Sequence, residues 1–120
     1  MMYRSPHPTF GENDPDLPGG TADGDEVLID TIIREVDEEI QVKVDKSAVE
    51  LVYAGNDYSD HDTHYALFIT RVDERPKITM SWEHSSYEWI DRDDFIRISA
   101  GARDTYMHMV AGVLKNQPKY

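Results

Sequence analysis

Three glutamates in the first third of the chain have the spacing that a metal site on a helix requires. Glu35, Glu38 and Glu39 stand at positions i, i+3 and i+4, so on a helix their carboxylates share one face. Like charges at this spacing destabilise a helix by about 0.2–0.5 kcal/mol per pair. A bound divalent cation would reverse the sign of that interaction, and oxygen ligands without His or Cys favour Mg²⁺ or Mn²⁺ over Zn²⁺. These glutamates are therefore candidate metal ligands, with a solvated acidic helix face as the alternative interpretation.

The segment that must position these glutamates, residues 27–40, has a helical period. Apolar residues recur there at spacings of three and four, namely Leu28, Ile29, Ile32, Ile33, Val36 and Ile40. This pattern predicts an amphipathic helix whose apolar face lies beside the glutamates. Asp23 or Asp25 is expected to cap the start of the helix. Residues 5–25 are rich in Pro, Gly, Asp and Asn and predict a long loop.

The rest of the chain has mostly strand signals, followed by a second helix. Strands are predicted at 49–54, 64–72 and 77–82, with a short fourth at 87–90. An amphipathic helix is predicted at 100–116. Because no internal repeat or domain boundary is visible, we expect a single α/β (α+β) domain over residues 1–120, with helices packed on a sheet.

The composition narrows the classes of function. With 24 acidic and 12 basic residues, the formal charge is −12, which disfavours duplex nucleic acid as a partner because such binding needs basic phosphate contacts. The chain has no cysteine, so disulfides and thiolate metal sites are excluded. Its apolar stretches, such as 65–69, are too short to span a membrane, and its N-terminus has no apolar signal-peptide core. We therefore expect a soluble, cytoplasmic protein that does not interact with membranes.

Residues 20–42 resemble the Nudix box, the pattern GX5EX7REUXEEXGU in which U is an aliphatic residue. The positions in register are Gly20, Glu26, Arg34, Glu35, Val36, Glu38, Glu39 and Val42. The departure is Gln41, which stands where the family has the glycine that ends the helix. Six fixed Gly, Glu or Arg positions coincide by chance about once in 10⁷ windows, so the pattern is specific. Residues 17–20 (LPGG) and 83–95 (EHSSYEWIDRDDF) resemble family segments on either side of the box.

This resemblance implies a Nudix-like fold, in which a mixed sheet is sandwiched between helices. It also implies a MutT-like hydrolase that cuts a pyrophosphate linkage with Mg²⁺ or Mn²⁺. Glu38 and Glu39 would be direct metal ligands, Glu35 a direct or water-mediated ligand, and the backbone carbonyl of Gly19 a further ligand.

Other residues would support or complete this site. The resemblance implies that Arg34 orients the glutamates and that Glu26 holds both the loop and Arg34 in place. Glu83 lies six residues before Trp89, as a second-loop metal ligand or general base does in some family members. Pyrophosphate cleavage needs a cation to offset phosphate charge and a base within reach of the attacking water. Either Glu35 or Glu83 would be that general base.

Markers of the subfamilies lie outside the box. ADP-ribose hydrolases tend to have proline where this chain has Asp57, and a coenzyme A motif would have Arg and Gly where Thr9 and Asn13 stand. Tyr58 falls where diadenosine polyphosphate hydrolases tend to carry a tyrosine. The expected substrate is therefore a nucleoside diphosphate-X compound, either a (deoxy)nucleoside triphosphate or a dinucleoside polyphosphate. Tyr58 and Arg4 are candidate substrate-binding residues, with a loop aromatic and a surface charge as the respective alternatives.

Some histidines and tryptophans near the expected site have less specific patterns. His61 and His64 match no metal-ligand spacing and are expected at the surface. Trp82 and Trp89 flank the second loop and are expected to pack in the core rather than to stack on a base.

Two further expectations concern the whole molecule. Family members usually begin with a strand ahead of the segment at 3–5, so that first strand is expected to be missing, and an open sheet edge favours a homodimer. The alternative function is a Nudix-like module that binds or senses a nucleotide without hydrolysing it. The presence of Glu35, Glu38 and Glu39 favours the enzyme.

Overall fold

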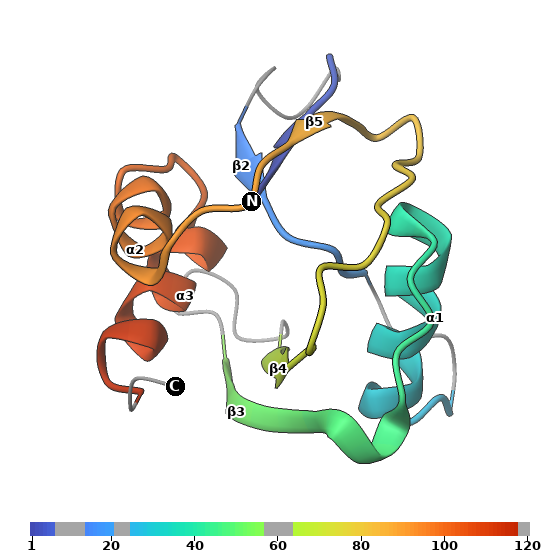
Figure 1. Ribbon diagram of the computed structural model, residues 1–120. Coiled ribbons are helices and arrows are strands. Elements are labelled where there is room, and N and C mark those ends of the chain that lie inside the picture. Colours follow the sequence, from blue (N-terminus) through green and yellow to red (C-terminus); the bar gives the residue numbers. More distant parts are fainter. Residues whose placement is uncertain (7–13, 21–24, 57–63, 118–120) are drawn as a thin grey trace. The chain divides into compact units, whose positions relative to one another are not determined.

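The computed structural model describes residues 1–6, 14–20, 25–56 and 64–117, without the side chains of Asn56 and His64. The chain forms two compact units, one made of Met1–Leu17 with Met80–Tyr120 and the other of Pro18–Thr79. Figure 1 labels the elements of both. Two compact units of this size can belong to one domain. That residues 1–120 form a single domain therefore stays a prediction.

The unit Pro18–Thr79 contains the helix that carries the box glutamates. This helix, α1, spans Leu28–Ile40, so the prediction of a helix at 27–40 is confirmed. The prediction that Asp25 caps it is wrong, because the residue before the first turn is Val27, which has no side-chain capping bond. The first helical bond runs from Thr31 N to Val27 O at 3.0 Å. The other predicted cap, Asp23, lies outside the described residues.

The end of α1 has an unusual backbone conformation. Gln41 has φ 55° and ψ 40°, in the left-handed region, where an L side chain crowds its own backbone. Its amide donates to Asp37 O at 3.0 Å, which satisfies one of the helix's terminal carbonyls. The helix therefore ends where the glycine of the box pattern would end it, although a glutamine occupies the position.

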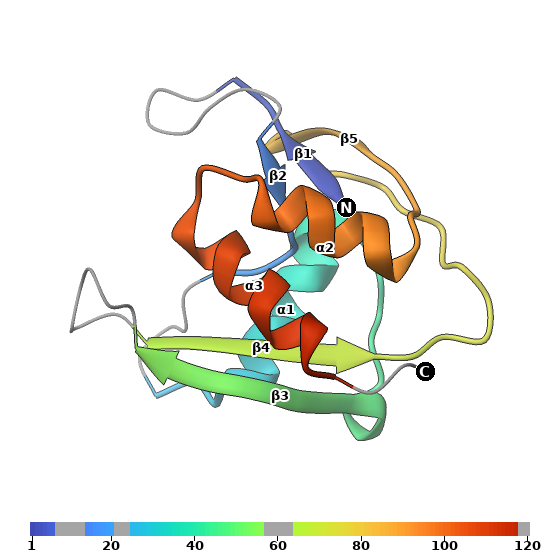
Figure 2. The same cartoon turned by 90° about the vertical axis from the view of Figure 1, so that its left-hand side faces the viewer.

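Two strands follow α1 in the same unit. After a short 3-10 turn, η1 (Lys46–Ala48), come β3 (Val49–Asn56) and β4 (His64–Thr70). They pair antiparallel, with an irregularity in register between Leu51 and Tyr53, and Figure 2 shows them side by side. Both strands are rich in β-branched and aromatic residues, and the predictions of strands at 49–54 and 64–72 are confirmed with small shifts at their ends.

The third predicted strand, at 77–82, is wrong. Ile78 and Met80 are more buried than Lys77 and Thr79, so the alternation that suggested a strand is real. The segment nevertheless pairs with no strand of the described chain. The amide of Thr79 instead donates to Ile40 O at the end of α1, at 3.0 Å. An alternating pattern of apolar and polar residues indicates which side chains face inward, but it does not determine which groups the backbone bonds to.

The other unit combines a small sheet with two helices. Strands β1 (Met2–Arg4), β2 (Pro15–Asp16) and β5 (His84–Tyr87) form an antiparallel sheet in the order β2-β1-β5. β5 lies three residues earlier than the strand predicted at 87–90. The helices are α2 (Arg92–Ala100) and α3 (Thr105–Lys115), where the sequence predicted one helix at 100–116.

Aspartate caps start both of these helices. Asp91 accepts from Asp94 N at 2.8 Å and Asp104 accepts from Tyr106 N at 2.9 Å, each satisfying an amide of a first turn. In α3, Met107 and Val110 are fully buried one turn apart, so they form much of this unit's core. Arg92 of α2 donates to the carbonyls of Leu114 and Gln117 at the end of α3, which joins the two helices.

A buried polar pair joins the outer strands of this sheet. Nε2 of His84 on β5 lies 2.8 Å from Oδ2 of Asp16 on β2, and the His84 side chain is only 1% exposed. Arg4, on the central strand β1, places Nη2 3.3 Å from the same aspartate oxygen. Each of the three strands therefore contributes one side chain to a single polar cluster.

Taken together, these elements confirm the expected mixed α/β class. The described strands pair antiparallel in two sheets, where the resemblance implied one mixed sheet. Over the described ranges, none of the helices has the length and apolar character that a membrane crossing requires.

Candidate active site

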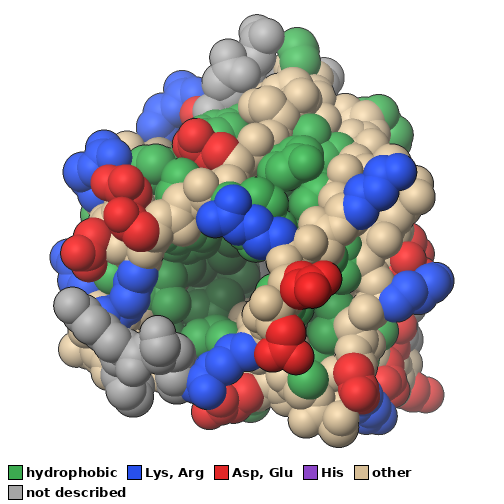
Figure 3. All heavy atoms as spheres, viewed as in Figure 1, with side chains coloured by type: hydrophobic (Ala, Val, Ile, Leu, Met, Phe, Trp, Pro, Cys, Tyr) green, Lys and Arg blue, Asp and Glu red, His purple; other side chains and the backbone are tan. Residues whose placement is uncertain are grey.

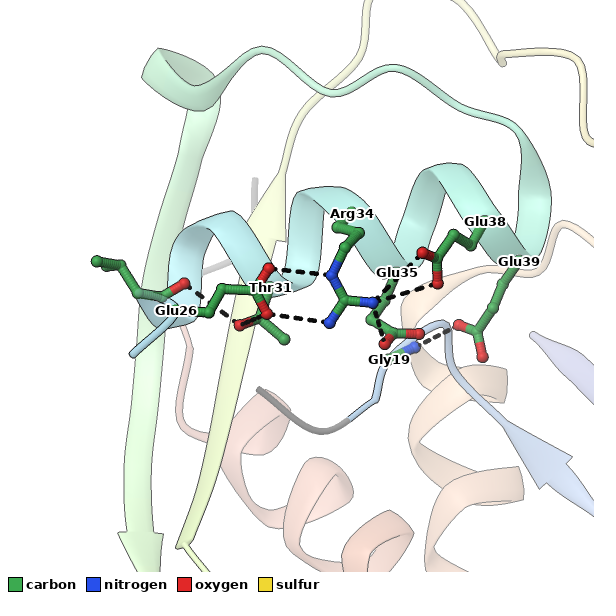
Figure 4. Close-up of polar contacts among 8 residues, drawn as sticks. Gly19, Glu26, Thr31, Arg34, Glu35, Glu38 and Glu39 are labelled. Atoms are coloured by element: carbon green, nitrogen blue, oxygen red, sulfur yellow. Dashed lines mark hydrogen bonds and ion pairs between the residues drawn. The ribbon is translucent and has the colours of Figure 1, made fainter. Parts of the chain in front are cut away.

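The site is built around the guanidinium of Arg34, which projects from α1 among several carboxylates (Figure 4). Its Nε and Nη2 donate to the two oxygens of Glu26, both at 3.0 Å. This two-pronged pairing matches the planar geometry of the guanidinium and is the strongest form of arginine–carboxylate contact. Glu26 lies two residues before the helix begins, so the pairing ties the entering chain to the second turn of α1.

The remaining nitrogen of Arg34 faces two of the predicted metal ligands. Nη1 donates to Glu35 Oε1 at 2.9 Å and lies 3.3 Å from Glu38 Oε2. Hydrogen bonding to Glu26, and then to Glu38, raises the pKa of the Arg34 guanidinium above its ordinary value. Arg34 therefore stays positively charged, and its role is to hold carboxylates rather than to transfer a proton.

Glu39 is held differently from its two neighbours. Its side chain points away from Arg34 to the loop before the helix, where Oε2 accepts from Gly19 N at 2.6 Å (Figure 4). Glu39 is only 6% exposed, and a buried carboxylate is costly unless hydrogen bonds compensate it. The resemblance implied a role for the carbonyl of Gly19, and the contact in the structure is made by its amide.

Gly20 allows the loop to approach the helix closely. A Cβ added at this position would lie 2.3–2.6 Å from the carboxyl atoms of Glu35, which is far inside van der Waals contact. The absence of a side chain at Gly20 therefore creates the space that the Glu35 carboxylate fills. At Gly19 an added Cβ would meet nothing within 4 Å, so only the second glycine of the pair is required sterically.

Thr31 joins the hydrogen bonds around Arg34 and Glu26, and no pattern in the sequence indicates it. Its hydroxyl lies 2.8 Å from Glu26 Oε1, and the residue is only 5% exposed. Thr31 occupies an unspecified position of the box pattern, and its partner lies five residues earlier, outside the helix. No periodic spacing marks such a pair, so only the structure reveals it.

The donor set matches the chemistry of a hard divalent cation. Glu35, Glu38 and Glu39 supply carboxylate oxygens, which Mg²⁺ prefers, and the space at Gly20 admits Glu35 to the loop. In the part of the chain that the structure describes, no three His, Asp or Glu side chains are grouped so as to hold an ion. Arg34 pairs with both Glu35 and Glu38, while Glu39 bonds to the loop.

The structure brings the box residues together in the unit Pro18–Thr79, whereas two other predicted site residues belong to the other unit. Glu83 is exposed, its amide lies 3.4 Å from Ser81 Oγ, and its carbonyl accepts from Ser5 N at 3.0 Å. Arg4 faces Asp16 at 3.3 Å and, more distantly, Asp104. Tyr58 lies outside the described residues.

Two predictions about nearby aromatic residues need correction. Trp82 is 76% exposed and Trp89 is 45% exposed, so the expectation that they pack in the core is wrong. Trp82 is the last residue of the segment at 77–82, which pairs with no strand of the described chain, so its side chain is not part of a sheet face. His61 and the side chain of His64 lie outside the described residues.

The surface carries charges of both signs. On the face shown in Figure 3, acidic and basic side chains are interspersed, with apolar side chains visible between them.

Comparison with protein families identifies the architecture. A family model described as NUDIX domain matches residues 2–109, which is most of the chain and includes the Arg34 network. Comparisons with curated proteins and with solved structures gave no match. NUDIX proteins are, in general, hydrolases of phosphoric anhydrides. The chain therefore belongs to the NUDIX family.

Proposed function

We propose that this chain is a Mg²⁺-dependent pyrophosphohydrolase that acts on a nucleoside diphosphate-X compound. The proposed substrates are (deoxy)nucleoside triphosphates and dinucleoside polyphosphates. The observation that carries the proposal is the placement of three glutamates on α1: Glu39 accepts from the Gly19 amide of the preceding loop, and Glu35 and Glu38 accept from Arg34.

The residues that would hold the cation are Glu38 and Glu39, with Glu35, the Gly19 backbone and Glu83 as further ligands. Mg²⁺, when bound, offsets charge on the phosphate oxygens and activates water for attack. The carboxylates and the cation would attract each other, because Glu26, Glu35 and Glu38 share the guanidinium of Arg34 and together carry more negative charge than it offsets.

The chain's own groups prepare this site before substrate arrives. Arg34 restricts Glu35 and Glu38, the Gly19 amide restricts Glu39, and Glu26 restricts Arg34. Such restriction lowers the reorganisation that binding and reaction require. A carboxylate in reach of the attacking water must accept its proton, and Glu35 and Glu83 are the two proposed bases.

Hydrolysis assays test the proposal directly. Wild-type protein is incubated with nucleoside triphosphates, diadenosine polyphosphates, ADP-ribose and coenzyme A, with Mg²⁺ or with a chelator, and phosphate or pyrophosphate release is measured. We expect turnover of the first two classes only, and only with the cation. Removing an essential ligand should cost at least about 100-fold, so Glu38→Gln and Glu39→Gln should each lose at least this much turnover.

Glu50→Gln is the matched control, because Glu50 is an exposed glutamate on β3. Glu35→Gln and Glu83→Gln separate the two candidate bases. Replacing the residue that is the base should lower turnover and also abolish the decline of turnover at acidic pH, whereas replacing the other residue should leave that decline in place. Wild-type turnover in both the Glu38 and Glu39 variants would refute the assignment of the site.

The alternative function is a module that binds a nucleotide without hydrolysing it. The contact of Arg34 Nη1 with both Glu35 and Glu38 favours this alternative, because it leaves these carboxylates already paired. Tight nucleotide binding by calorimetry, with no turnover at any Mg²⁺ concentration, would select it over the enzyme.

A further inference from the structure

Thr31 makes a hydrogen bond that its position in the helix does not require. A threonine inside a helix usually bonds to the carbonyl four residues earlier, which here is Val27 O at 3.3 Å. The Glu26 carboxylate is closer, at 2.8 Å. A hydroxyl has one hydrogen to donate, and a bond to a charged acceptor is the stronger one. The geometry therefore assigns that hydrogen to Glu26.

This bond fixes the carboxylate of Glu26 relative to the backbone of α1. Glu26 Oε1 receives both the Thr31 hydroxyl and Arg34 Nη2, and Oε2 receives Arg34 Nε. Figure 4 shows Thr31, Glu26 and Arg34 meeting on one side of the helix. Because Thr31 is almost fully buried, its side chain has little freedom to move, and it restrains the carboxylate with it.

The orientation of Arg34 depends on this restraint. With two nitrogens directed at Glu26, Arg34 offers only Nη1 to Glu35 and Glu38. If Glu26 were loosened, the guanidinium would turn further toward Glu35 and Glu38, with which it already forms ion pairs. A divalent cation would then have to displace a more completely paired arginine.

We propose that Thr31 is a positioning residue for the metal site, which acts by holding Glu26 so that Arg34 engages Glu35 and Glu38 through Nη1 alone and a cation can displace it from them. This inference rests on the proposed function, because it takes these two glutamates to be ligands. It predicts that the hydroxyl of Thr31 influences cation affinity although it touches no ligand.

Two substitutions separate the hydroxyl from the volume of the side chain. Thr31→Val keeps the branched shape and removes the hydroxyl, whereas Thr31→Ser keeps the hydroxyl. Loss of a group that orients metal ligands commonly weakens metal affinity by about tenfold or more. We expect Thr31→Val to weaken Mn²⁺ binding in calorimetry by about tenfold, and Thr31→Ser to bind Mn²⁺ nearly as tightly as wild type.

The dependence of turnover on Mg²⁺ distinguishes positioning from a general structural defect. For Thr31→Val we expect the half-saturating Mg²⁺ concentration to rise by the same factor, with turnover recovering in excess Mg²⁺. A structural defect would lower turnover at every Mg²⁺ concentration, and that result would overturn the proposal. Circular dichroism checks folding, and Thr31→Ala, which also lacks the hydroxyl and favours a helix, takes over the test if the valine variant is unfolded.

The outcomes separate this inference from the function on which it rests. Suppose that the wild-type enzyme is active and that the Thr31→Val or Thr31→Ala variant binds Mn²⁺ as tightly as wild type. This result would overturn the role of Thr31 and leave the proposed function standing. A wild-type protein that neither binds Mn²⁺ nor hydrolyses any nucleotide of the panel would overturn the proposed function, and the role of Thr31 with it.

Discussion

Arg34 is the residue on which the charge balance of the site depends. It faces three carboxylates, those of Glu26, Glu35 and Glu38, so among these four side chains the negative charges outnumber the positive charge three to one. Such an excess favours a divalent cation at this end of the helix. The planar fork of the guanidinium also sets the direction of each carboxylate, which a point charge would not do.

Replacing Arg34 by lysine tests whether geometry or charge matters. Arg34→Lys keeps the charge but cannot pair with both oxygens of Glu26 and also reach Glu35. We expect turnover to fall about 10- to 100-fold with the helix intact, as measured by steady-state kinetics and circular dichroism. Arg97→Lys is the control, because Arg97 on α2 forms an exposed pair with Asp94. Full activity of Arg34→Lys would show that charge alone suffices.

Gly20 supports a second prediction at this scale. In Gly20→Ala the new methyl would displace the Glu35 carboxylate, which an added Cβ would approach to 2.3–2.6 Å. Because the displaced atoms are the end of a flexible side chain, we expect a small change in stability and a loss of turnover of about tenfold. Gly112→Ala, at an exposed helix position with open space around it, should leave turnover unchanged. Equal turnover in the two variants would contradict this role of Gly20.

At the scale of the element, the end of α1 stores strain. The left-handed conformation costs an ordinary residue about 1–2 kcal/mol, and a glycine avoids this cost but loses about 0.5–1 kcal/mol through its greater freedom when unfolded. Gln41 therefore shows that the hydrogen bond to Asp37 and the path of the following chain outweigh the local penalty.

Substituting this residue should stabilise the protein. From the two terms above, Gln41→Gly is expected to raise the free energy of unfolding by about 0.5–1 kcal/mol, as measured by urea denaturation followed by circular dichroism. Gln41→Ala keeps the strained backbone and should give little gain. A destabilised glycine variant would mean that the glutamine side chain makes a contribution larger than the strain.

The elements also show how far sequence patterns reach. The apolar period of residues 27–40 correctly predicted α1 and, with it, that the glutamates lie on one face of the helix. The helix α2 was missed because its signals are the cap at Asp91 and the acidic first turn, not a strong apolar period. The strand predicted at 77–82 failed because backbone pairing is a property of tertiary structure. Thr31 escaped notice because its partner, Glu26, precedes the helix.

At the scale of the whole molecule, the unit that contains Met80–Tyr120 depends on its buried Asp16–His84 pair. A buried polar group left without its partner costs about 1–3 kcal/mol, so Asp16→Ala should lower the free energy of unfolding by this amount. Asp14→Ala is the control, since its side chain pairs with an exposed Arg103 and such pairs contribute less than about 1 kcal/mol. Thermal unfolding measures both, and similar losses would contradict the importance of the buried pair.

The exposure of the two tryptophans has a practical consequence. Trp82 and Trp89 are the only tryptophans in the sequence, and both lie in the unit that contains Met80–Tyr120. Their indole rings already meet solvent in the native state, so we expect their emission to change little on denaturation. An indole introduced on α1 itself, for example at the half-exposed Leu28, would give a spectroscopic probe within the glutamate helix.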